Sequence, residues 1–81
     1  MRIVFSDRAI DALKDAPVAV QRTFENKLRF LLHNLNHPSL HAKKYHEGED
    51  VWQGRVNRGW RFYFSISGDT YFIRDVIPHP K

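Results

Sequence analysis

Apolar residues in the first half of the chain recur at the spacing of a helix face. The longer apolar stripe comprises Val20, Phe24, Leu28, Leu31, Leu32 and Leu35. Charged side chains mostly occupy the other sides of this predicted helix, and Pro38 forbids its continuation. A shorter helix is predicted over Asp7–Asp15, with Ser6 as its N-cap and Pro17 as its end. The short link between the two helices predicts an αα-hairpin.

Strand-forming residues flank the predicted helices on both sides. Arg2–Phe5 is short, β-branched and aromatic and predicts a first strand. Three further strands are predicted over Val51–Asn57, Trp60–Ser67 and Thr70–Ile77, and the polar segment Ser39–Asp50 predicts a long loop. The order β-αα-βββ indicates a single α+β two-layer domain over residues 1–81. The helices would cover one face of an antiparallel sheet and leave the other face to solvent or a ligand.

The register of the first hairpin follows from its apolar pattern. A two-residue loop would mix core and solvent sides, so we expect a three-residue loop over 57–59, with Gly59 in the left-handed region. The core-side pairs are then Val56 with Trp60, Gly54 with Phe62 and Trp52 with Phe64, and the open-side pairs are Arg55 with Arg61 and Gln53 with Tyr63. Like charges directly opposite each other destabilise a sheet by about 0.2–1 kcal/mol. The Arg55–Arg61 pair therefore predicts a face that binds phosphate.

The second hairpin has two possible registers. A two-residue loop at 68–69 is favoured, although it places Asp75 opposite Phe62 on the core side. A three-residue loop would instead bring Asp75 across from Arg61. The favoured register pairs Phe64 with Ile73 and Trp60 with Ile77, and it places Arg74 with Tyr63 on the open face.

The amino-acid composition limits which partners the chain can bind and which reactions it can catalyse. The 81 residues are 42% apolar, which suffices for one small core. Thirteen Lys and Arg oppose nine Asp and Glu, so the net charge of +4 favours nucleic acid or an acidic protein as partner. The lack of cysteine excludes disulfides, cysteine zinc sites and thiol catalysis. No apolar run is long enough for a membrane helix or a signal peptide, so we expect an intracellular protein without membrane contact.

Three groups of residues could supply chemistry. Lys43 and Lys44 precede the predicted hairpins and could clamp a phosphate backbone. His79 ends the last strand between two prolines and could act as a general acid or base. Glu47, Glu49 and Asp50 form an acidic cluster, one of which could take a proton from a 2′-hydroxyl.

The histidines also include a pair with the spacing of metal ligands. His33 and His37 lie four residues apart, as do paired ligands on one helix face. Pro38 ends that helix, however, and the chain has no cysteine to complete a site. We therefore expect no metal site.

The element order and the stretch VWQGRVNRGWRFYFSISGDTYFIRDVIPHPK resemble the RelE/ParE superfamily of toxins from bacterial type II toxin–antitoxin systems. The resemblance covers nearly the whole chain. It implies a cytoplasmic, ribosome-dependent endoribonuclease that cleaves mRNA through 2′-hydroxyl attack, needs no cofactor and is held by a cognate antitoxin. The chain departs from many members of the family because it ends at Lys81, without their terminal tyrosine or helix.

The resemblance also implies roles for individual residues. It makes Arg61, Arg55 and His79 catalytic, with Glu47 or Glu49 as a further candidate base. The RNA-binding residues that we predict are Lys43, Lys44, Arg58, Tyr63 and Lys81. Two other functions remain open: inhibition of DNA gyrase without nuclease activity, as in ParE-like members, and plain RNA binding by a basic α+β domain.

Overall fold

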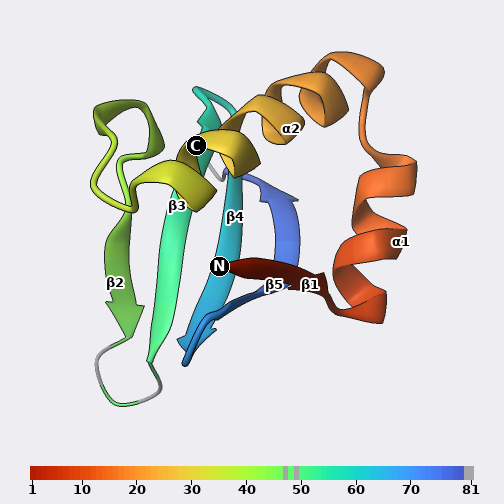
Figure 1. Ribbon diagram of the computed structural model, residues 1–81. Coiled ribbons are helices and arrows are strands. Elements are labelled where there is room, and N and C mark those ends of the chain that lie inside the picture. Colours follow the sequence, from red (N-terminus) through yellow and green to blue (C-terminus); the bar gives the residue numbers. More distant parts are fainter. Residues whose placement is uncertain (47, 49, 80–81) are drawn as a thin grey trace.

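The computed structural model of the protein describes residues 1–46, 48 and 50–79. They form a five-stranded sheet in the order β1-β5-β4-β3-β2, with α1 beside β5 and α2 over β3 (Figure 1). The elements are β1 (Arg2–Phe5), α1 (Asp7–Asp15), α2 (Val18–His33), the short 3₁₀ helix η1 (Pro38–Leu40), β2 (Lys43–His46), β3 (Val51–Asn57), β4 (Trp60–Ser67) and β5 (Thr70–Pro78). The α+β prediction is confirmed.

The sheet is mixed rather than purely antiparallel as predicted. β1 runs parallel to β5, while the β2–β3, β3–β4 and β4–β5 pairs are antiparallel. The segment predicted as a loop over Ser39–Asp50 also contains η1 and the edge strand β2. β2 consists of polar and aromatic residues only, and it owes its conformation to pairing with β3. Lysines on an edge strand oppose further strand pairing, so this composition is consistent with an edge position.

Both helices are anchored by side-chain hydrogen bonds. The Ser6 hydroxyl accepts the N–H of Ala9 at 3.0 Å and donates to the Arg74 carbonyl at 2.8 Å, so the predicted N-cap also ties α1 to β5. Gln21 of α2 donates to the Leu13 carbonyl at 2.7 Å and thereby links the two helices. None of the described helices is long and apolar enough to cross a membrane.

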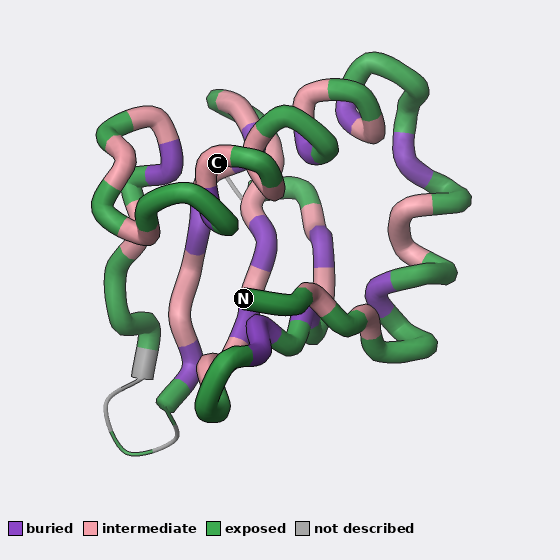
Figure 2. The backbone as a smooth tube through the Cα atoms, viewed as in Figure 1, coloured by how far each residue is buried: buried purple, intermediate pink, exposed green. Residues whose placement is uncertain are grey.

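The core lies between the helices and one face of the sheet. Buried positions recur along β3, β4 and β5, separated by half-buried and exposed ones (Figure 2). The ring of Phe24 in α2 packs edge-on against Phe62 in β4, with 5.2 Å between centroids. Leu32 was expected in the apolar stripe but is 44% exposed, because α2 turns that position away from the sheet.

The first hairpin has the predicted register over most of its length. The pairs at 52–64, 53–63, 54–62 and 55–61 are confirmed. The predicted three-residue loop and its pairing of Val56 with Trp60 are wrong, because a bulge at Val56 places Asn57 opposite Trp60 and leaves a two-residue turn at 58–59. Gly59 is not in the left-handed region, and its N–H is instead bound by the Asn57 side chain at 2.8 Å. The bulge lets Val56 be fully buried while the Arg55–Arg61 pair keeps its place.

The second hairpin begins in the favoured register and then shifts. The two-residue loop and the pairing of Phe64 with Ile73 are confirmed. A bulge between Ile73 and Asp75 then puts Asp75 opposite Tyr63, so the predicted pairing of Trp60 with Ile77 and of Asp75 with Phe62 is wrong. The extra residue turns the Asp75 carboxylate away from the core side, so the free-energy cost of burying it there does not arise.

Candidate functional site

A polar hollow lies on the sheet face that the helices leave uncovered. We call it the basic hollow; it is lined by His41, Ala42, Lys43, Gln53, Gly54, Arg55 and Arg61 and has a volume of about 420 Å³. β2, β3 and β4 each contribute to it, so its shape depends on the register of both strand pairs. Three of its side chains are cationic, and none is a carboxylate.

The Arg55–Arg61 pair dominates the charge of the basic hollow. Arg61 Nη1 donates to the Asn57 carbonyl at 2.6 Å and to the Trp60 carbonyl at 2.9 Å, which orients this guanidinium toward the β3–β4 turn. The ion pairs of the described part of the chain, Arg8–Asp75 and Lys44–Asp50, leave both guanidinium groups without a carboxylate partner. Two arginines at directly paired strand positions, neither with a carboxylate partner among the described residues, are suited to binding an anion.

The positive potential extends beyond the hollow to α2. Burial and the nearby charge of Arg55 together lower the pKa of Lys27. The Lys27 ammonium donates to the Ser39 carbonyl at 3.1 Å, so it also fixes the chain just before the hollow. An anion bound at Arg55 would relieve this repulsion.

The two lysines that were predicted to clamp a phosphate backbone lie on opposite faces of β2. Lys43 lines the basic hollow. Lys44 lies opposite Trp52, with its ammonium 6.0 Å from the Trp52 ring centroid and 3.4 Å from an Asp50 oxygen. Because neighbouring strand residues point to opposite faces, only Lys43 joins the arginines.

The remaining predicted residues lie around the turn at one end of the hollow or outside the described residues. Arg58 is exposed in the β3–β4 turn. The His79 N–H donates to the Gly59 carbonyl at 2.8 Å, which holds the exposed His79 beside that turn. Continuing the β5 alternation places His79 on the side of Ile77, which pairs with Arg61. Glu47, Glu49 and Lys81 lie outside the described residues.

A second hollow adjoins the first through a tyrosine. This tyrosine hollow has a volume of about 560 Å³ and is lined by Ser6, Arg8, Tyr45, Val51, Tyr63, Arg74, Asp75 and Ile77. The predicted residue Tyr63 lies here, and its hydroxyl accepts from Gln53, a residue of the basic hollow, at 3.1 Å. The ring of Tyr45 meets that of Tyr63 edge-on at 5.1 Å and is 59% exposed. An exposed aromatic beside a cationic groove can stack on a nucleobase.

Sequence reasoning missed three residues of these hollows as binding or catalytic candidates: His41, Gln53 and Tyr45. The signal for two of them was the alternation of His41, Lys43 and Tyr45, which has the period of a strand. His41 also has a left-handed backbone with φ 45°, which is unusual for a residue other than glycine. Such backbone positions cluster at functional sites.

His33 and His37 do not come together as metal ligands. The ring of His37 stacks on Phe30 with centroids 4.1 Å apart, and its Nδ1 lies 2.9 Å from the Ser39 hydroxyl. Within the described residues, no three histidine, aspartate or glutamate side chains cluster so that they could hold a metal ion. The contacts of His37 with Phe30 and Ser39 give it a structural role at the start of η1.

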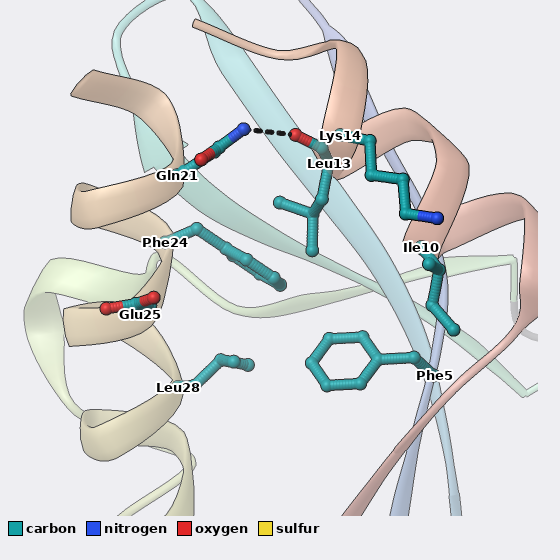
Figure 3. Close-up of a pocket in the computed structure, with 8 residues that line it drawn as sticks. All are labelled: Phe5, Ile10, Leu13, Lys14, Gln21, Phe24, Glu25 and Leu28. Carbon is teal, nitrogen blue, oxygen red and sulfur yellow. Dashed lines mark hydrogen bonds between the residues drawn. The ribbon is translucent and has the colours of Figure 1, made fainter. Parts of the chain in front are cut away.

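A third cavity opens between the two helices. We call it the interhelix cleft; Figure 3 shows its lining residues, which are Phe5, Ile10, Leu13, Lys14, Gln21, Phe24, Glu25 and Leu28. Its volume is about 340 Å³, and its walls are mostly apolar. The cleft lies on the helix side of the sheet, so it is separate from the basic hollow.

Comparison with known proteins identifies the fold. No protein-family model matches the sequence, and no curated protein matches it significantly. The solved structures that it resembles include the YoeB/ParE toxin from Agrobacterium tumefaciens, at a TM-score of 0.81 and 13% identity, covering 99% of this chain and 100% of that one. The RelE–RelB complex from Pyrococcus horikoshii OT3 matches at a TM-score of 0.79 and 18% identity, covering 95% and 92%. The E. coli RelBE complex matches at 0.75 and 15% identity, covering 98% and 96%. The chain therefore has the fold of the RelE/ParE toxins.

Proposed function

We propose that this chain is the toxin of a type II toxin–antitoxin pair and cleaves mRNA. The observation that carries the proposal is the Arg55–Arg61 pair, which faces an open hollow and has no carboxylate partner among the described residues. Like charges directly opposite each other cost stability, so the pair is better explained by a phosphate ligand than by folding. The shared fold with RelE and YoeB toxins supports the same function.

The proposed reaction uses the substrate's own nucleophile. The 2′-oxygen of one nucleotide attacks the adjacent phosphorus, and the bond from phosphorus to the 5′-oxygen of the next nucleotide breaks. A base on the protein takes the 2′-proton, and an acid returns a proton to the departing 5′-oxygen. The products are a 2′,3′-cyclic phosphate and a 5′-hydroxyl. Because the nucleophile comes from RNA, no metal ion is needed to generate it.

The two guanidinium groups act on the charge that develops during this reaction. Negative charge grows on the non-bridging phosphate oxygens as the 2′-oxygen attacks. Arg55 and Arg61 would present N–H donors to those oxygens from two neighbouring strands, whose register places the two residues directly opposite each other. Stabilisation of this kind is usually the largest single contribution to catalysis.

The remaining predicted residues position the RNA strand. Lys43 in the basic hollow and Arg58 at the turn would hold phosphates on either side of the cleaved bond. Tyr63 and Tyr45 in the tyrosine hollow would stack on a neighbouring base. His79, held beside the turn through its backbone, is the predicted proton donor or acceptor at that end.

The partners we propose are the mRNA in the ribosome and a cognate antitoxin. Solved structures with this fold include RelE–RelB complexes and a YoeB–YefM complex from Staphylococcus aureus. In this chain, the net charge of +4 favours an acidic antitoxin segment that covers the basic hollow. The interhelix cleft would accept apolar side chains of the same partner.

Induction of the chain in bacteria separates this function from gyrase inhibition. We expect growth to stop with translation arrested and transcripts cut within coding regions, as measured by pulse labelling and mapping of 5′ ends. A variant with both Arg55→Gln and Arg61→Gln serves as the matched control and should leave transcripts intact. Growth arrest with intact transcripts and a DNA damage response would instead indicate a gyrase inhibitor, and no growth effect would indicate plain RNA binding.

A further inference from the structure

The basic hollow contains one side chain with a nitrogen that can serve as a base. Among its lining residues, Arg55, Arg61 and Lys43 are cationic donors, and the Gln53 amide is not a base. His41 is the exception, because a neutral imidazole carries a free nitrogen lone pair. It lines the same hollow as the two arginines.

The contact between His41 and Arg55 brings one ring nitrogen of His41 close to the guanidinium group. His41 Nε2 lies 3.4 Å from Arg55 Nη1. A guanidinium group can only donate, so a hydrogen bond in this contact requires Nε2 to accept, in the tautomer that carries the ring proton on Nδ1. In that tautomer the basic nitrogen of His41 is the one that lies beside Arg55.

The chain before His41 is held firmly against α2. The His37 ring stacks on Phe30, and its Nδ1 contacts Ser39, whose carbonyl is bound by Lys27. The next residue, Leu40, is fully buried. These contacts fix the start of the turn that leads into the left-handed backbone of His41.

We infer that His41 is the general base that removes the 2′-proton of the RNA substrate. This inference rests on the proposed function and refines it, because sequence reasoning assigned that role to His79 or to a loop carboxylate. When a phosphate binds between Arg55 and Arg61, the Arg55 guanidinium donates to phosphate oxygen and releases Nε2 of His41. Nε2 then accepts the proton as the 2′-oxygen bonds to phosphorus, and the Arg55 and Arg61 donors hold the charge on the phosphate. His79 is then the candidate acid, which donates the second proton to the departing 5′-oxygen.

Two variants test His41 without disturbing its backbone. Asparagine and glycine both tolerate the left-handed region, so His41→Asn and His41→Gly should melt within a few degrees of the wild type. The assay uses the full chain with ribosomes programmed with mRNA. We expect either variant to cut at a rate lower by about 10²-fold or more, while affinity for 2′-deoxy-substituted RNA is nearly unchanged. Added imidazole should restore part of the His41→Gly rate, because it can occupy the vacated space and accept the proton.

His33→Ala is the matched control, because His33 is an exposed histidine at the end of α2 and lines none of the three cavities. It should cut at the wild-type rate. Wild-type rates in the two His41 variants, or loss of RNA affinity without rescue by imidazole, would overturn the inference and leave the proposed function standing. A wild-type chain that cuts no RNA would instead overturn the proposed function, and the role of His41 with it.

Discussion

Replacement of Arg61 by alanine is expected to lower the rate of mRNA cleavage by about 10²-fold or more, the effect typical of losing one donor to a charge that forms in the transition state. Arg61 shares the basic hollow with Arg55 and has no carboxylate partner among the described residues. The rate is measured with purified chain on programmed ribosomes. Arg61→Lys keeps the charge but not the planar fork, so we expect an intermediate rate.

Arg22→Ala is the control for charge alone. Arg22 is exposed on α2, on the helix side of the sheet, and its loss changes the net charge by the same amount. Because Arg61 also donates to the Asn57 and Trp60 carbonyls, thermal unfolding of each variant separates a loss of catalysis from a loss of turn structure. A folded Arg61→Ala protein that cuts RNA at the rate of the Arg22→Ala protein contradicts the assignment.

Substitution of Gly54 by alanine is expected to destabilise the fold by about 1–3 kcal/mol, the cost typical of overfilling a packed core. Gly54 lies directly opposite Phe62, and a Cβ atom at this position would overlap the Phe62 ring. That ring is fully buried between Phe24 and Phe64, so it has little room to move away. In a domain of this size, each 1 kcal/mol lowers Tm by roughly 4–8 °C.

Gly59→Ala provides the comparison for Gly54→Ala. Gly59 is exposed in the β3–β4 turn and has an ordinary backbone conformation, and the nearest atom to an added Cβ lies at 3.9 Å. We expect its Tm to stay close to that of the wild type. Equal melting temperatures for the two variants would show that the Phe62 ring does not pack across Gly54 as described.

The sequence predicted the elements whose side chains alternate clearly between core and solvent. The bounds of β1, α1, β3 and β4 match the predictions. At these places the spacing of the apolar residues, the Ser6 cap and the turn residues all indicated the same element bounds. The facing arginines also followed from the apolar pattern alone. A strand register with one buried face leaves little freedom, since a slip of one residue would expose the core.

The apolar pattern of the sequence could not predict the two β-bulges. The extra residues at Val56 and before Asp75 are adjustments that bury Val56 and move the Asp75 carboxylate to the open face. A pattern of period two cannot signal an inserted residue, because it assumes one partner for each position. The conflict over Asp75 was visible in the sequence, but its resolution depended on tertiary packing.

The site was predicted only in part for a related reason. β2 contains two lysines and no aliphatic residue, so it lacks the composition expected of a strand, and pairing with β3 determines its conformation. Without that strand, His41 and Tyr45 could not be placed beside the arginines, and Lys44 could not be told apart from Lys43. The alternation of His41, Lys43 and Tyr45 has the period of a strand, but it does not show which strand β2 pairs with.

The most direct test of the proposed RNA cleavage removes a single oxygen atom, the 2′-oxygen at the cleavage position, from the substrate. An mRNA with one 2′-deoxy nucleotide at the mapped cleavage position is placed in programmed ribosomes with the purified chain. We predict cutting of the all-ribose message, with a 2′,3′-cyclic phosphate on the upstream fragment, and no cutting at the 2′-deoxy position. Equal cutting of both messages, or no cutting of the all-ribose message, would contradict the account.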